Sequence, residues 1–161
     1  MRIGVFSDSH GDISNARRFF DHLAPLDCLF HLGDYASDGD KVSKLFGCPL
    51  YAIRGNCDFR SEEPLERLVD LGGKRFLLVH GHQYYSWNAL LYRGEETHAD
   101  MVLYGHTHMP DLSADGARLL LNPGSLSRPR GGSAYSCALV LLEGQELRVR
   151  FVNEDSVASR W

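Results

Sequence analysis

Seven side chains of the types that bind metal ions each follow a short apolar stretch of this sequence. They are Asp8, His10, Asp34, Asn56, His80, His106 and His108. The successive intervals from His10 to His106 are 24, 22, 24 and 26 residues, each about the length of one strand and its connection. Residues that follow the carboxyl ends of strands in an open α/β sheet meet at one edge. We therefore predict that these side chains lie together.

The chemistry of this set matches a site for two metal ions. Carboxylate, amide oxygen and imidazole together suit borderline divalent ions such as Mn²⁺, Fe²⁺, Co²⁺, Ni²⁺ or Zn²⁺. Seven ligands are too many for one tetrahedral ion but about right for two ions that share a carboxylate, and Asp34 is the expected bridge. Residues two apart on an extended segment face the same way, so Asp8 with His10, and His106 with His108, are each expected to point to one place.

Each short pattern also has an ordinary structural interpretation. An isolated Asp-x-His or Gly-Asp is common in turns and at surfaces. A His-x-His pair carries more weight because it has ligand spacing. The ordered set, with each member just past an apolar run, is what indicates a metal site.

The first part of the chain alternates between predicted strands and helices. The strands are expected at 2–6, 27–31 and 50–54, and the helices at 12–24 and 39–46. Asp12 is the expected N-cap of the first helix. This β-α-β-α-β order predicts a mainly parallel sheet with helices on its faces.

The second part of the chain predicts a hairpin, a helix and further strands. Gly72-Gly73 is expected to join strands at 65–71 and 75–80, and Ser86 to cap a helix with Trp87, Leu90 and Leu91 on its apolar side. Further strands are expected at 101–104 and, as an antiparallel tail, at 118–121, 134–142 and 147–152. We predict one α/β domain over residues 1–161, with two sheets.

Composition limits the class of protein. The 161 residues are 43% hydrophobic and 24% charged, which is ordinary for one globular domain. The net charge of -4 gives no support to a nucleic-acid or membrane-surface binder, although self-association into a homo-oligomer stays open. The four cysteines form no CxxC pair, and the N-terminal apolar run is too short for a signal peptide. These features predict free thiols and a cytoplasmic location.

Five motifs in order resemble those of the calcineurin-like metallophosphoesterase superfamily. They are Asp8-Ser9-His10, Gly33-Asp34, Gly55-Asn56-Cys57-Asp58, His80-Gly81-His82 and Gly105-His106-Thr107-His108. The match runs from residue 8 to residue 108. The short chain and the segment Asn122-Pro123-Gly124-Ser125 are similar to the small YfcE-type phosphodiesterases of that superfamily.

The resemblance implies a fold, a cofactor and an activity. The fold is a four-layer α/β/β/α sandwich, in which two mixed β-sheets are flanked by helices (the metallo-dependent phosphatase fold). The cofactor is a pair of divalent ions per chain, Mn²⁺ first, with Ni²⁺, Zn²⁺, Fe²⁺ or Co²⁺ as alternatives. One ion is expected at Asp8, His10, Asp34 and His108, and the other at Asp34, Asn56, His80 and His106. The activity is hydrolysis of small phosphoesters, chiefly diesters, by a hydroxide that bridges the ions.

Three consecutive residues are the catalytic candidates: Asn56, Cys57 and Asp58. Many members of the superfamily carry His where this chain has Cys57. A thiol donates a proton to a leaving group less readily than an imidazolium does, which favours diesters with acidic leaving groups. Cys57 is alternatively a small thiol without a role, and Asp58 either orients a ligand or caps a turn.

Substrate phosphate contacts are expected from Arg54, His82 and Arg128, with Arg130 as a further candidate. Guanidinium groups pair well with phosphate. For each arginine, a solvated surface position is an equally good interpretation.

Two other classes of function remain open. The first is a catalytically weak scaffold, because the small subunit of the retromer coat resembles this fold and shares the His-Gly-His-Gln segment at 80–83. The intact Asp34 argues against it. The second is a phosphomonoesterase or nucleotide phosphatase that uses the same centre.

Overall fold

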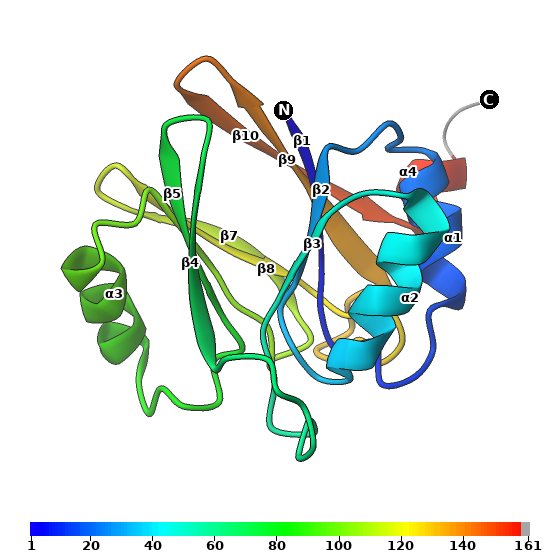
Figure 1. Ribbon diagram of the computed structural model, residues 1–161, viewed down its shortest axis with the longest axis horizontal. Helices are drawn as coiled ribbons and strands as arrows, with labels where there is room; N and C mark the ends of the chain where they lie inside the picture. The colour runs from blue at the N-terminus through cyan, green and yellow to red at the C-terminus, as the bar shows by residue number, and fades with distance from the viewer. Residues whose placement is uncertain (159–161) are drawn as a thin grey trace.

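The computed structural model describes residues 1–158, and their strands form two five-stranded sheets (Figure 1). The first sheet contains β1 (Arg2–Phe6), β2 (Cys28–His31), β3 (Leu50–Ala52), β9 (Ser136–Glu143) and β10 (Glu146–Asn153). Its order is β10-β9-β1-β2-β3, with β1, β2 and β3 parallel and the other neighbours antiparallel. The helices α1 (Ser14–Asp21) and α2 (Ala36–Phe46) connect the parallel strands, which confirms the predicted β-α-β-α-β order.

The second sheet lies against the first and is also mixed. It contains β4 (Glu66–Leu71), β5 (Lys74–Val79), β6 (Met101–Leu103), β7 (Pro110–Asp115) and β8 (Arg118–Pro123), in the order β4-β5-β6-β8-β7. The strands β5, β6 and β8 are parallel, whereas β4 and β7 run antiparallel at the edges. The helix α3 (Trp87–Glu96) covers the outer face, and the Ser86 hydroxyl accepts from the Ala89 N–H at 3.2 Å, as predicted for its cap.

Alternating apolar side chains explain the four layers. In β5, Phe76 and Leu78 enter the core between the sheets, while Leu77 and Val79 face the α3 side. Phe6 of β1 packs with Phe19 and Phe20 of α1 on the other outer face. Burying one such phenylalanine contributes roughly 1.5–3 kcal/mol. The predicted four-layer α/β/β/α sandwich is confirmed, with α3 on one side and α1, α2 and α4 (Glu154–Ala158) on the other (Figure 1).

The helix α1 differs from its prediction at both ends, whereas α2 ends at Phe46 as predicted but begins earlier. Asp12 is not the N-cap of α1: that position is Ile13, and the Asp12 carboxylate accepts from the Ser14 N–H at 2.9 Å in the preceding turn. α1 also ends at Asp21 rather than near residue 24. α2 begins at Ala36, three residues before the predicted start, because the carboxylate of Asp58 accepts from the Ala36 N–H at 2.7 Å. That cap comes from another loop, so local sequence does not reveal it.

The predicted antiparallel tail is confirmed for β9 and β10, which pair antiparallel, but not for β8. β8 joins the second sheet, parallel to β6, while β9 and β10 complete the first sheet. β7 and the short helix α4 were not predicted from the sequence. β7 starts with Pro110 and lies at an edge, a position where a strand tolerates proline. The loops after the parallel strands gather at the lower edge in Figure 1.

No helix among residues 1–158 has the length and apolar character needed to cross a membrane. All four cysteines lie within that range and are free, as predicted.

Candidate metal centre

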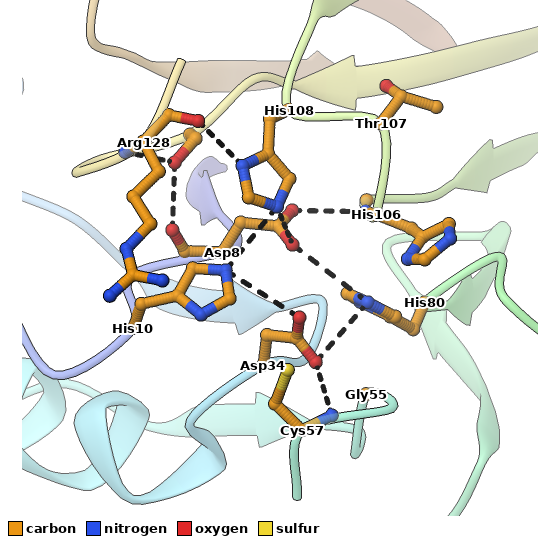
Figure 2. Close-up of polar contacts among 12 residues, drawn as sticks. Asp8, His10, Asp34, Gly55, Cys57, His80, His106, Thr107, His108 and Arg128 are labelled. Atoms are coloured by element: carbon orange, nitrogen blue, oxygen red, sulfur yellow. Dashed lines mark hydrogen bonds and ion pairs between the residues drawn. The ribbon is translucent and has the colours of Figure 1, made fainter. Parts of the chain in front are cut away.

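The seven predicted ligands lie on loops that follow β1, β2, β3, β5 and β6, at the edge where both sheets present their strand ends. Figure 2 shows six of them, all except Asn56. Backbone hydrogen bonds tie these loops to one another. The Asp8 N–H donates to the Gly33 carbonyl at 3.1 Å, and the Gly105 N–H donates to the His80 carbonyl at 3.0 Å. Loops from distant parts of the chain are thereby held side by side.

Five of the seven predicted ligands have a left-handed backbone. The φ angles are 54° at Asp8, 47° at His10, 59° at Asp34, 67° at His106 and 60° at His108. Such a conformation costs a non-glycine residue about 1–3 kcal/mol and persists only where the surroundings impose it. The prediction that the paired ligands converge because they lie on extended segments is therefore wrong. Their directions are set by tight turns.

Glycines before three ligands allow the loops to pack closely. A Cβ on Gly55 would overlap the Asp34 carboxylate, and one on Gly105 would overlap the Ser7 hydroxyl. At Gly33 a Cβ would lie 2.8 Å from Nδ1 of His80. The Gly-Asp, Gly-Asn and Gly-His motifs thus have a steric cause.

Four ligands form the first ligand group: Asp8, His10, Asp34 and His108. One potential ligand atom from each lies within 4.8 Å of the others. Nε2 of His108 lies 3.1 Å from Oδ1 of Asp8 and 3.3 Å from Nε2 of His10. Oδ1 of Asp8 is buried and forms no hydrogen bond with any described residue. Two imidazoles and two carboxylates converge here, and one carboxylate oxygen has no hydrogen-bond partner among the described residues. Such a group fits a divalent ion.

The second predicted ligand group comprises Asp34, Asn56, His80 and His106; among the described residues, its carboxylate and imidazoles do not converge as closely as those of the first group. Nε2 of His80 lies 3.4 Å from Oδ1 of Asp34 and 3.1 Å from Oδ1 of Asn56. The ring of His106 lies 5.2 Å from that of His80, between centroids. His106 and His108 therefore belong to different groups. Asp34 faces both, since its Oδ2 lies 3.6 Å from Nε2 of His10.

Backbone carbonyls orient two of the imidazoles. Nδ1 of His108 donates to the Arg128 carbonyl at 2.6 Å, and Nδ1 of His80 donates to the Leu32 carbonyl at 2.7 Å. A carbonyl only accepts, so each Nδ1 carries a proton and each Nε2 faces the centre. Without a metal ion, contact with Asp8 raises the pKa of His108; burial opposes charge on His80, but contacts with Asp34 and Asp8 raise its pKa. Loss of the Nε2 proton leaves a lone pair that points into the centre. This arrangement fixes the tautomer that a metal ligand needs.

Burial and charge shift the ionisation of these groups. Burial lowers the pKa of His10 and of His106, so both are neutral imidazoles at pH 7. Burial opposes charge on Asp34, but hydrogen bonds from His80 and from the Cys57 N–H hold the pKa of Asp34 well below its usual range. Neutral imidazoles beside an ionised carboxylate form a donor set suited to a divalent cation.

The three catalytic candidates differ in their surroundings. The Cys57 thiol lies 3.6 Å from Nδ2 of Asn56, and loss of hydration together with the nearby Asp34 raises the pKa of Cys57 to about 11. Asp58 accepts from the N–H groups of Gly55 and Ala36 at 2.8 and 2.7 Å. Its carboxylate therefore holds the loop, which favours the turn-capping interpretation for Asp58.

The predicted substrate contacts lie around the centre. The side chain of Arg128 extends beside His10 (Figure 2). The ring of His82 lies 5.4 Å from that of His80, between centroids, and Arg54 is near enough to lower the pKa of His82. Arg130 likewise acts on the pKa of His106. Arg128, His82 and Arg130 are thus close to predicted ligands, whereas Arg54 is close to His82.

Sequence reasoning missed the residues that brace the ligand loops. The carboxylate of Asp38 is fully buried and accepts from the Ser9 hydroxyl and the Gly11 N–H, both at 2.8 Å, on either side of His10. Ser125 donates to the Asp8 carbonyl at 2.8 Å, and Ser127 donates to the Ser9 carbonyl at 2.7 Å. The Asn-Pro-Gly-Ser segment was a signal for Ser125. No local pattern marks Asp38.

Two face-to-face mixed sheets with imidazoles and carboxylates at their strand ends define the metallophosphoesterase class of fold. The chain belongs to the calcineurin-like phosphoesterase superfamily, whose domain model matches residues 1–145.

Similar proteins cover nearly the whole chain. A probable metallophosphoesterase of Bacillus subtilis, YsnB, is 32% identical over 158 residues, which cover 96% of this chain and 92% of the relative. The phosphodiesterase YfcE of Escherichia coli is 27% identical and covers 99% of this chain and 97% of YfcE.

Solved structures agree on the fold. A predicted phosphoesterase of Streptococcus pneumoniae superposes with a TM-score of 0.81 at 31% identity, over 96% of this chain and 90% of that one. The Zn²⁺ complex of Vps29 from Entamoeba histolytica superposes with a TM-score of 0.77 at 17% identity, over 95% and 99%. At that identity the second likeness concerns the fold alone.

Proposed function

We propose that this chain is a metal-dependent phosphodiesterase that hydrolyses small phosphate diesters at a two-metal centre. The position of Asp34 carries the proposal. Its Oδ2 lies 3.6 Å from Nε2 of His10, and its Oδ1 lies 3.4 Å from Nε2 of His80. A carboxylate whose two oxygens face two ligand groups has the geometry of a bridging ligand.

The ligand set favours Mn²⁺ or a similar borderline ion over Mg²⁺, which prefers oxygen ligands. Two such ions supply Lewis acidity, which polarises a phosphoryl oxygen and acidifies a water at neutral pH. The chain itself keeps His80 and His108 in the ligating tautomer through the carbonyls of Leu32 and Arg128. It also holds Asp34 ionised, so that the carboxylate is ready to bind cations.

Side chains around the centre are proposed to bind and orient the ester. Arg128 lies beside His10 (Figure 2), whereas His82 lies beside His80. Both are placed to contact phosphoryl oxygens, and a guanidinium pairs well with them. Asn56, at the edge of the second ligand group, is proposed to stabilise charge on the phosphoryl group.

The cysteine at position 57 favours diesters over monoesters as the substrates of the proposed enzyme. A monoester with an alkoxide leaving group requires a proton donor, and a thiol serves that role less well than an imidazolium. The phosphodiesterase YfcE, at 27% identity, supports the same choice. A nucleotide phosphatase activity is the second candidate. The scaffold function receives less support, because Asp34 and the other six ligand positions all carry ligand-type side chains.

Metal removal and replacement test this proposal. Chelator-treated protein should not hydrolyse bis(4-nitrophenyl) phosphate, and Mn²⁺ should restore turnover better than Mg²⁺. 4-Nitrophenyl phosphate, measured in parallel, should be the poorer substrate. Circular dichroism of the apo protein is the control that it is still folded. Full turnover after chelation would rule out the metal-dependent mechanism, and a preference for the monoester would favour the phosphatase.

The cellular context is part of the proposal. Free thiols at Cys28, Cys48 and Cys137 support a cytoplasmic location. Cell fractionation tests it. The net charge of -4 supports a small phosphoester as the partner rather than nucleic acid or membrane.

A further inference from the structure

A small aromatic pocket opens beside the second ligand group. Its volume is about 190 Å³. The residues that matter for its chemistry are Tyr84, Trp87, Leu90, Tyr104, His106 and Thr107. His106 belongs to both the pocket and the second ligand group, so a molecule bound at the centre can extend directly into this pocket.

Three aromatic side chains, Tyr84, Trp87 and Tyr104, form much of the wall of the pocket. The Tyr104 hydroxyl donates to Asp111 at 2.8 Å, and the Tyr84 hydroxyl donates to Glu66 at 3.1 Å. Both hydroxyls are thus engaged by carboxylates, which leaves the rings as the surfaces offered to a ligand. The Trp87 ring stands edge-on to that of Tyr104, with centroids 5.6 Å apart and an angle of 73°.

Trp87 is held in place yet open to solvent. It is the first residue of α3, directly after the Ser86 cap, and it is 45% exposed. An aromatic side chain that is anchored on a capped helix offers a large stacking surface at low entropic cost. None of the described residues that line the pocket is a lysine or arginine. The pocket therefore suits a neutral flat group and not the phosphate itself.

The leaving group and the retained ester group of a diester are expected to bind in different cavities. Cys57, where many relatives of this superfamily have the leaving-group acid, lines a separate cavity of about 610 Å³ and does not line the aromatic pocket. The leaving group is expected on the Cys57 side. The aromatic pocket beside His106 is then free for the ester group that stays on the phosphorus.

We infer that the aromatic pocket binds a flat aromatic group of about one ring, carried by the retained ester of the phosphodiester and stacked on Trp87. This inference rests on the proposed function. A cavity of about 150 Å³ holds benzene, so about 190 Å³ accommodates one substituted ring. The proposal names a substrate class: aryl-type diesters over alkyl diesters.

Two chromogenic diesters with the same leaving group test the inference in the Mn²⁺-loaded protein. Bis(4-nitrophenyl) phosphate retains a ring on the phosphorus, whereas methyl 4-nitrophenyl phosphate retains a methyl group. Stacking on one aromatic side chain predicts a KM about tenfold lower for the first substrate. Trp87→Ala should raise that KM about tenfold and change the KM of the methyl ester less than about twofold, with kcat nearly constant for both.

Matched variants protect the test. Trp87→Phe should keep most of the preference, and Trp87→Leu, which retains apolar volume without a ring, should lose it even if the alanine variant folds poorly. Tyr92→Ala, on an aromatic residue of the same helix that is 70% exposed, should change neither KM. Equal KM changes for both substrates in the Trp87 variants, or no change in either, would overturn the inference. If the wild-type protein hydrolyses neither substrate, the proposed function is contradicted instead.

Discussion

The two ligand groups of the centre are built differently. In the first ligand group, Asp8 and His108 are buried, and Ser125, Arg128 and Asp38 brace the loops that carry the ligands. In the second, His80 is fully buried but Asn56 is exposed and His106 is only half-buried. A braced set of ligands loses little entropy when it binds an ion. If the proposed two-metal centre is correct, we expect the first group to hold its ion more tightly and the second to be the more open to substrate.

Replacement of Asp34, the carboxylate shared by the two ligand groups, should have the largest effect on metal binding and activity. Asp34→Asn changes the one residue that faces both groups, so both ions should bind more weakly. We expect kcat/KM to fall more than about 100-fold, because loss of outer partners alone costs about 10- to 100-fold. Metal analysis after desalting measures the ions retained per chain. His10→Ala is the matched comparison and should affect chiefly one ion; equal metal loss in the two variants would count against a bridging Asp34.

Loss of Asn56 should separate the two groups. Asn56→Ala removes a ligand only from the open side, so metal content should fall from about two ions to about one per chain, with activity reduced roughly 100-fold. Isothermal titration calorimetry with Mn²⁺ measures the affinity of each ion and so distinguishes the tighter site from the weaker one. Should the tighter ion be the one that is lost, the first ligand group is not the stronger site.

The brace of the first ligand group can be weakened without touching a ligand. Asp38→Asn replaces a buried acceptor of the Ser9 hydroxyl and the Gly11 N–H, and it also breaks the ion pair with Lys41. We expect the affinity of the tighter ion to fall about tenfold. Asp40→Asn, two residues away on the same helix and exposed, is the control and should bind Mn²⁺ normally. Unchanged affinity in the Asp38 variant would mean that the loop keeps its shape without this carboxylate.

The smallest expected effect lies at the edge of the second ligand group. Cys57→His should raise the ratio of monoester to diester hydrolysis a few-fold, because an imidazolium with a pKa near ~6.5 donates a proton at neutral pH more readily than the Cys57 thiol, whose pKa is raised to about 11. The exposed position of Cys57 leaves room for the larger ring. Metal content is measured first, since a displaced Asn56 would mimic a catalytic effect. A variant that keeps its ions and its substrate ratio would assign Cys57 no role in proton transfer.

Residue types and their intervals were sufficient to predict an α/β domain with two sheets and to predict which side chains lie together, whereas the four-layer arrangement came from the family resemblance. The apolar stretches at 2–6, 28–31 and 50–52 are long enough to specify buried strands, and helical patterns between them enforce parallel pairing. The polar residues just past those stretches necessarily reach one sheet edge. That is why the sequence alone predicts that the side chains from Asp8 to His108 lie together. Their roles as ligands remain part of the proposal.

Only the tertiary structure decided how those side chains are aimed. The left-handed turns at Asp8 and His106 depend on contacts with loops about a hundred residues away, such as the hydrogen bond from the His106 N–H to the Asp8 carboxylate at 3.0 Å. The start of α2 depends on the carboxylate of Asp58, which lies on the loop after β3. The sequence determined which residues reach the centre because strand ends are set by local apolar patterns. Their orientation and bracing come from contacts between distant segments, which local patterns do not encode.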